Sequence, residues 1–132
     1  MTVPLAVYGS LRRGLALPYQ PADFDRLLAD RVPCVIAGRL VDLGAYPGLL
    51  EGEGRVVADL CRLADEGSLA LFDDYEGYDR HHLDTSRYLR IMVRLVEPRV
   101  DAWTYLYNQA WTPEMLVGSG DWHHHLSTRP PG

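Results

Sequence analysis

Alternating hydrophobic and polar positions along much of the chain predict a fold built mainly from β-strands. The clearest case is residues 88–96, where leucine, isoleucine or valine stands at every odd position from 89 to 95. A period of two is typical of a strand with one apolar face. Other strand candidates are residues 3–8, 35–43 and 55–63, and turn residues at 44–48 and glycines at 52 and 54 separate the last two.

The last predicted strand, residues 100–107, has an aromatic face, and Pro98-Arg99 fits the turn before it. The alternation sends three aromatic residues to one side and three other residues to the opposite side: Trp103, Tyr105 and Tyr107 against Ala102, Thr104 and Leu106. Such a face is more typical of core packing than of a platform for nucleic-acid bases.

Two segments have helical character. Residues 23–30 predict a short helix capped by Asp23. A second helix is expected to begin at Ser68 and to end near Glu76, because Gly77 fits the stop position of a helix.

One carboxylate of the second helix falls on its apolar side. That side is marked by Leu69, Leu71, Phe72 and Tyr75. Glu76 lies between Phe72 and Leu69 on the helical projection, whereas Asp73 and Asp74 are predicted to point away. Burial disfavours a charged carboxylate, so the pKa of Glu76 is expected to rise into the range useful for acid–base chemistry. The alternative is a side chain that reaches solvent or pairs with an arginine such as Arg90.

Together these elements predict an α/β (α+β) fold: a small, mixed, mostly antiparallel β-barrel with flanking helices. Strict βαβ alternation is missing, which argues against a dinucleotide-binding fold of the Rossmann type. Residues 1–122 are predicted to form a single domain, and residues 123–132, with two adjacent prolines, a flexible tail.

Composition restricts the possible functions. The 132 residues carry a net charge of −5, which disfavours binding to nucleic acid or to anionic membranes. All 13 basic residues are arginine, which excludes lysine-based Schiff-base chemistry and a Walker-type phosphate loop. No apolar run is long enough to span a membrane, and the first residues do not resemble a signal peptide. A cytoplasmic protein is expected.

Cysteine and histidine residues give no metal signal. Cys34 and Cys61 form no CxxC motif and are expected to be reduced thiols in the core. The run His123-His124-His125 cannot direct all three rings at one ion, and no acidic or cysteine partner has ligand spacing. We expect a surface run rather than a metal site.

The segment Tyr8-Gly9-Ser10-Leu11-Arg12-Arg13-Gly14 joins a predicted strand to a glycine-containing loop. Glycine allows neighbouring backbone N–H groups to turn toward a small anion such as a carboxylate or phosphate. An ordinary turn with solvated arginines is the alternative. A serine-hydrolase elbow is not supported, since the second glycine of that motif is missing.

Taken in order, the motifs resemble the γ-glutamylcyclotransferase-like superfamily, in particular its branch of γ-glutamylamine cyclotransferase and AIG2-like proteins. The resemblance covers roughly residues 3–122. It is carried by Val7-Tyr8-Gly9-Ser10-Leu11-Arg12-Arg13-Gly14, Gly38-Arg39-Leu40, Tyr46-Pro47-Gly48, Asp74-Tyr75-Glu76-Gly77-Tyr78, Tyr88-Leu89-Arg90, Ala102 to Asn108, and Ser119-Gly120-Asp121-Trp122.

The resemblance implies an enzyme, of transferase or lyase type, that releases 5-oxoproline from a small γ-glutamyl amine or γ-glutamyl amino acid without cofactor or metal. It implies that the loop Tyr8 to Leu11 holds the glutamyl group through backbone groups and that Glu76 is the catalytic acid–base residue. Tyr88, Arg90 and Tyr105 match positions that either contact the substrate or support Glu76.

Two other functions remain open. One is a binding module for a small carboxylate ligand that retains the fold without turnover. The other is a different carboxylate or phosphate chemistry that uses Arg12 and Arg13.

Overall fold

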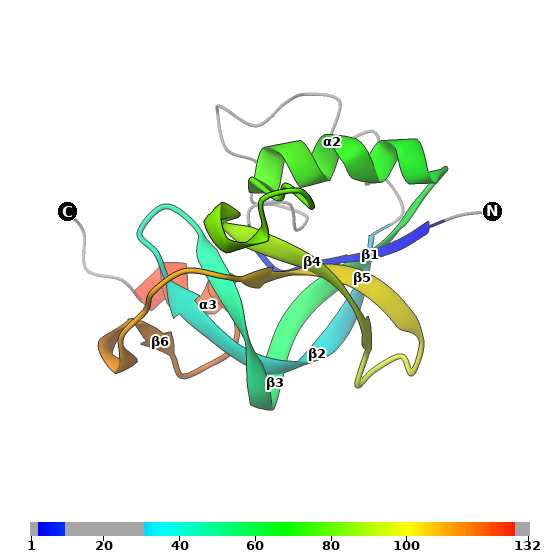
Figure 1. Ribbon diagram of the computed structural model, residues 1–132. Coiled ribbons are helices and arrows are strands. Elements are labelled where there is room, and N and C mark those ends of the chain that lie inside the picture. Colours follow the sequence, from blue (N-terminus) through cyan, green and yellow to red (C-terminus); the bar gives the residue numbers. More distant parts are fainter. Residues whose placement is uncertain (1–2, 10–30, 129–132) are drawn as a thin grey trace.

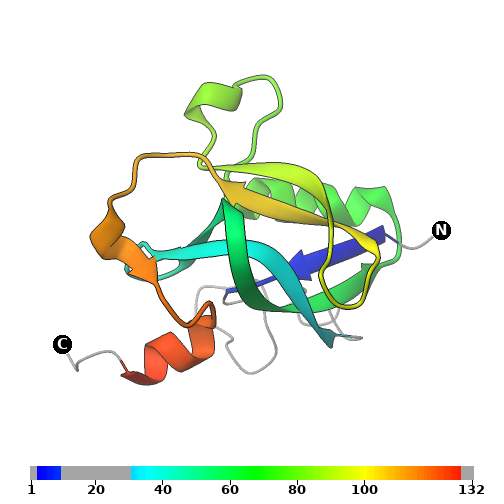
Figure 2. The ribbon, with the colours of Figure 1, turned by 90° about the horizontal axis from the view of Figure 1, so that it is seen from below.

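A single curved sheet of six strands forms the centre of the structure, a computed structural model that describes residues 3–9 and 31–128. The strands are β1 (Val3–Val7), β2 (Val32–Asp42), β3 (Pro47–Leu63), β4 (Tyr88–Arg94), β5 (Asp101–Tyr107) and β6 (Leu116–Val117). Helix α2 (Glu66–Glu76) lies across one face of the sheet, and α3 (Trp122–Thr128) lies at the end near β6 (Figures 1 and 2). Short 3-10 turns occupy Leu83–Thr85 and Pro113–Met115. The helix predicted at residues 23–30 lies outside the described residues.

The sheet confirms the predicted mixed, mostly antiparallel arrangement. Its strand order is β4-β5-β1-β3-β2-β6, with β1 and β5 parallel and most other neighbours antiparallel. The sheet curves so strongly that β3 also pairs with β5 at Leu49 and Leu106, although the barrel is not fully closed. Gly48 makes this approach possible, because a Cβ atom there would lie 2.7 Å from Cβ of Tyr107.

Strand β3 is longer than the sequence pattern predicts. The glycines at 52 and 54, expected to precede the strand, lie instead in a bulge within it. In the pairing of β2 with β3, Ala37 lies opposite Arg55 and Arg39 lies opposite Leu50. One residue of β2 therefore faces four residues of β3. Residues 51–54 are exposed there. Gly54 has φ +133°, and a Cβ atom at this position would meet the Gly38 carbonyl oxygen at 2.5 Å. The bulge bends β3, so that its first part reaches β5 and its last part pairs with β1.

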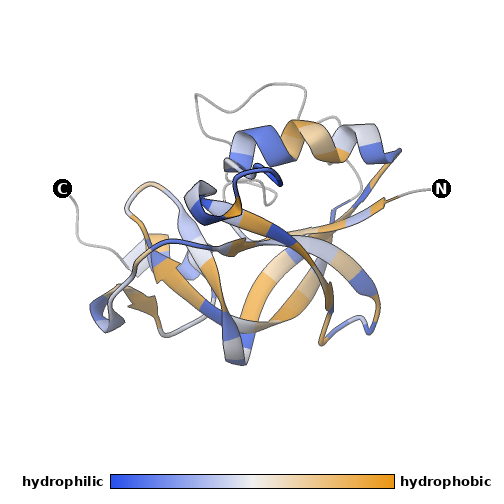
Figure 3. Cartoon of the chain, in the orientation of Figure 1, coloured by the Kyte–Doolittle hydropathy of each residue, from blue (hydrophilic) through white to orange (hydrophobic). Residues whose placement is uncertain are grey.

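Two groups of buried side chains hold the fold together. The first is enclosed by the curved sheet and includes Tyr8, Leu40, Leu49, Val56 and Trp122. The second lies between the sheet and α2, and it includes Leu5, Val7, Leu69, Phe72, Tyr88 and Tyr105. Figure 3 shows the matching hydropathy of α2, whose middle is hydrophobic and whose last turn is hydrophilic.

Several predicted features of the core are confirmed. Trp103, Tyr105 and Tyr107 pack in the group under α2, whereas Ala102 and Leu106 pack inside the curved sheet. The two cysteines, Cys34 and Cys61, are buried and not joined by a disulfide.

The C-terminal segment is helical as far as Thr128. Residues 123–128, predicted to belong to a flexible tail, continue the helix that begins at Trp122. The side chain of Trp122 is 1% exposed, and the Asp121 carboxylate accepts a hydrogen bond from the His124 N–H at 3.2 Å. His125 Nε2 lies 2.7 Å from the Asp42 carboxylate, which ties the helix to β2. A short helix with few apolar residues is stabilised here by tertiary contacts, which the local pattern does not reveal.

The described helices include none that is long and apolar enough to cross a membrane.

Candidate functional site

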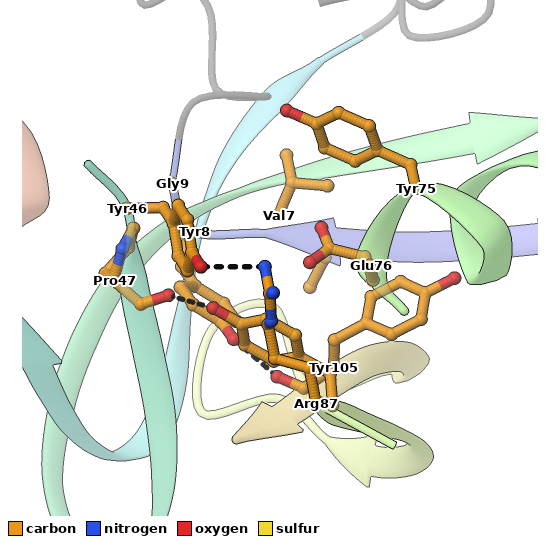
Figure 4. A pocket seen from close by; sticks show the side chains of 11 residues that line it. Val7, Tyr8, Gly9, Tyr46, Pro47, Tyr75, Glu76, Arg87 and Tyr105 are labelled. Carbon is orange, nitrogen blue, oxygen red and sulfur yellow. Dashed lines mark hydrogen bonds between the residues drawn. The ribbon is translucent and has the colours of Figure 1, made fainter. Parts of the chain in front are cut away.

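A small pocket lies where the last turn of α2 meets the ends of β1, β4 and β5 (Figure 4). Its volume is about 140 Å³, smaller than typical sites for drug-sized ligands. The wall is mostly aromatic and apolar, and it is formed by Ala6, Val7, Tyr8, Gly9, Tyr46, Pro47, Tyr75, Glu76, Arg87, Tyr88 and Tyr105. Such a pocket has room for one small metabolite.

Helix α2 directs Glu76 into this pocket. Leu69 and Phe72, 2% and 0% exposed, anchor the same side of the helix, so a residue four positions after Phe72 also faces the sheet. The helix begins earlier than predicted, at Glu66, because Asp65 rather than Ser68 caps it, by accepting a hydrogen bond from the Ser68 N–H at 3.0 Å. Its predicted end at Glu76 is confirmed.

Burial raises the pKa of Glu76 to about 7, and the positive charge of Arg87 opposes part of this rise. In Figure 4 the carboxyl group points into the space bounded by Val7, Tyr46 and Arg87. A carboxyl group with such a pKa can both accept and donate a proton near neutral pH.

Three buried tyrosines form the floor of the pocket. The Tyr8 hydroxyl donates to the Tyr105 carbonyl at 2.5 Å and accepts from the Leu49 N–H at 3.2 Å. The Tyr88 hydroxyl donates to the Pro47 carbonyl at 2.6 Å. Burial raises the pKa of all three phenols, so they stay protonated. The hydroxyls of Tyr8 and Tyr88 therefore join strands to one another, and their rings shape the pocket.

Asp73 corrects another prediction, since it does not point away from the fold. Its carboxylate accepts a hydrogen bond from the Tyr105 hydroxyl at 2.7 Å and lies 3.5 Å from a guanidinium nitrogen of Arg90. Arg90 in turn stacks over Trp103, with 4.7 Å between its Cζ atom and the ring centroid. Arg90 thus pairs with Asp73 rather than with Glu76. Leu71, predicted on the apolar side of the helix, is 53% exposed.

Arg87 and Tyr46 are pocket residues that the sequence analysis did not identify. The Arg87 guanidinium donates to the Tyr46 hydroxyl at 2.7 Å and lies over its ring, 5.5 Å from the centroid. The two residues are 41 positions apart. No local pattern links them, although Tyr46 belongs to one of the motifs that carry the resemblance.

The predicted substrate loop is described only in part. Tyr8 and Gly9 line the pocket, and Gly9 packs so closely on Pro47 that a Cβ atom would lie 2.9 Å from its Cδ atom. Ser10, Leu11, Arg12 and Arg13 lie outside the described residues.

The histidine run lies away from this pocket in α3, where His125 contacts Asp42. Within residues 3–9 and 31–128, no group of three or more histidine, cysteine or acidic side chains is arranged to hold a metal ion.

Comparison with known proteins links the chain to one family. The sequence model of the family described as "Gamma-glutamyl cyclotransferase, AIG2-like" matches residues 5–124. A Vibrio cholerae protein named "Putative gamma-glutamylcyclotransferase" is 37% identical over 87 residues. The match covers 63% of this chain and 64% of that protein, a little less than two thirds of its length.

Solved structures share the fold. The solution structure of Escherichia coli protein ytfP is 28% identical, with a TM-score of 0.61, and the match covers 91% of this chain and 96% of that one. An AIG2-like protein from Mus musculus is 24% identical, with a TM-score of 0.54, and the match covers 86% of this chain and 82% of that one.

Proposed function

The chain belongs to the γ-glutamyl cyclotransferase, AIG2-like family, and on that premise we propose that it releases 5-oxoproline from a small γ-glutamyl compound, with Glu76 as the acid–base residue. The observation that carries the proposal is the position of Glu76. Its carboxyl group faces a small pocket and has a pKa of about 7, in a chain whose family is named for this reaction.

The reaction is an intramolecular transfer. The α-ammonium group of the glutamyl part first gives a proton to the Glu76 carboxylate, and the free amine attacks the γ-carbonyl carbon. A new C–N bond closes the five-membered lactam, and the original amide C–N bond breaks. Of the three ammonium protons, one stays on the lactam nitrogen, and two move to the expelled nitrogen, which leaves as an ammonium group. No water is consumed, so atoms and charge balance.

The pocket supports this chemistry in two ways. Its small volume favours a folded glutamyl chain with the amine held close to its own carbonyl group, which supplies much of the acceleration of a ring closure. The pKa of Glu76 lies near neutral pH, where one group can first accept and then donate a proton. We propose that backbone N–H groups of the loop from Tyr8 to Leu11 hold the α-carboxylate of the substrate.

The pH dependence of the reaction follows from the role of Glu76. The ionised carboxylate is the form that accepts the first proton, so kcat/KM should rise as the pH increases through about 7. Arg87 lowers the pKa of Glu76, so Arg87→Gln should move the midpoint to higher pH. Initial rates of 5-oxoproline formation, measured from acidic to alkaline pH, give the profile of the wild-type protein and the midpoint of the Arg87→Gln variant. A flat profile for the wild-type protein would contradict the assigned role.

The proposal itself is tested by incubating the protein with a panel of γ-glutamyl amines and γ-glutamyl amino acids. Mass spectrometry should detect 5-oxoproline together with one equivalent of the released amine. Tight binding of a γ-glutamyl compound that stays intact would favour the binding module instead.

A further inference from the structure

Arg87 is the second charged side chain that the structure places on the pocket wall, beside Glu76. The charge of Glu76 is used in the proposed proton transfer, whereas that reaction gives the charge of Arg87 no role beyond its effect on the pKa of Glu76. Because Arg87 is exposed, it lies at the entrance of the pocket rather than in its buried part.

The entrance position of Arg87 is fixed from both its backbone and its side chain. The Arg87 N–H donates a hydrogen bond at 3.1 Å to the carbonyl of Gly77, the residue that follows Glu76. The Arg87 carbonyl accepts a hydrogen bond from the Asn108 N–H at 2.9 Å. The guanidinium is held by the hydroxyl and the ring of Tyr46. Arg87 therefore presents a cation of restricted position next to the acid–base residue, as Figure 4 shows.

The size of the pocket determines what meets this cation. A volume of about 140 Å³ is close to that of one glutamyl group. When the glutamyl group fills this volume, the leaving group extends toward the entrance, where Arg87 lies. In a γ-glutamyl amino acid, the carboxylate of the leaving group is separated from the scissile nitrogen by one carbon atom, so it also lies at the entrance.

We propose that the Arg87–Tyr46 pair binds a carboxylate on the leaving group, so that the preferred substrates are γ-glutamyl amino acids rather than γ-glutamyl amines. This inference rests on the proposed cyclotransferase function and specifies its substrate class. Arginine suits the role, since its planar guanidinium donates paired hydrogen bonds to a carboxylate. Its charge also offsets the repulsion between that carboxylate and ionised Glu76.

Two substrates that differ only in this charge provide the test: γ-glutamyl-alanine and γ-glutamyl-alaninamide. The wild-type protein should favour the first by about tenfold in kcat/KM, as expected for a charge-assisted hydrogen bond at a partly exposed site. Arg87→Gln should bring the ratio close to one, whereas Arg87→Lys should retain part of the preference. Any change in the pKa of Glu76 affects both substrates and cancels in the ratio.

Arg94→Gln is the matched control, because it removes the same charge from the same strand region at a residue that pairs with Asp101 outside the pocket. It should leave the ratio unchanged. The inference would be overturned if Arg87→Gln lowered kcat/KM equally for both substrates, because Arg87 would then serve the glutamyl group or Glu76 itself. A ratio of kcat/KM near one in the wild-type protein would also overturn it.

Binding measurements test the role of Arg87 independently of the proposed cyclotransferase activity. Calorimetry with the Glu76→Gln protein should give a tenfold difference in Kd between the two compounds, and the Glu76→Gln, Arg87→Gln double variant should lose it. A wild-type protein that binds both compounds and forms no 5-oxoproline would contradict the cyclotransferase proposal, while the Kd ratio would still decide the role of Arg87. Equal Kd values in the Glu76→Gln protein would overturn the inference about Arg87.

Discussion

Replacing Glu76 by glutamine should lower kcat by a factor of about 10² to 10⁴, the range typical of a lost general acid–base residue. The amide has nearly the same shape but cannot accept the proton of the substrate ammonium group. Release of 5-oxoproline under saturating substrate measures the effect. Asp74→Asn is the matched control, since Asp74 is an exposed carboxylate in the same helical turn. Retention of more than a tenth of the wild-type rate by Glu76→Gln would rule out the assigned role.

The same variant should fold at least as stably as the wild-type protein at neutral and alkaline pH. The folded-state pKa of about 7 lies above the ordinary value of 4.5, so the folded state binds the extra proton between these values. Stability therefore falls as the pH rises through this window, and Glu76→Gln should remove that slope. Thermal unfolding at acidic and alkaline pH measures the difference, and it also separates a loss of activity from a loss of folding.

Trp122→Ala should lower the free energy of unfolding by about 3–5 kcal/mol, as expected when a large aromatic side chain is removed from a core. The indole is 1% exposed and packs inside the curved sheet. Trp111, which is 38% exposed and lies beside Arg39, provides a control, and its replacement by alanine should cost far less. Denaturant unfolding compares the two variants. A similar loss for both would show that Trp122 does not anchor the core.

Removing residues 123–132 should also destabilise the protein, in contrast to what a flexible tail predicts. Truncation removes the contact between His125 and Asp42 and the packing of Leu126 against the core. The loss should be smaller than that of Trp122→Ala, because the indole remains.

The strand and helix periodicities predicted much of the architecture. Alternation assigned the two faces of β5 correctly, and helical spacing placed Glu76 on the side of α2 that packs on the sheet. These features depend on residues close together in the sequence, so local patterns suffice.

Sequence periodicity did not predict those features that depend on contacts between residues far apart in the sequence. Asp73 faces inward because Tyr105 and Arg90 contact it, and Arg87 reaches the pocket because Tyr46 holds it. Likewise, β3 continues through two glycines because β2 pairs with it on both sides of the bulge. Local propensity contains no information about such partners.

The place of Glu76 at the end of α2 has a consequence for its acidity that does not depend on the pocket. The aligned peptide dipoles of a helix leave partial negative charge on the carbonyl groups of its last turn, which disfavours an anion there. No basic residue lies in this turn of α2 to compensate. The backbone at the end of α2 therefore acts in the same direction as burial, toward the protonated form of Glu76, and against the positive charge of Arg87.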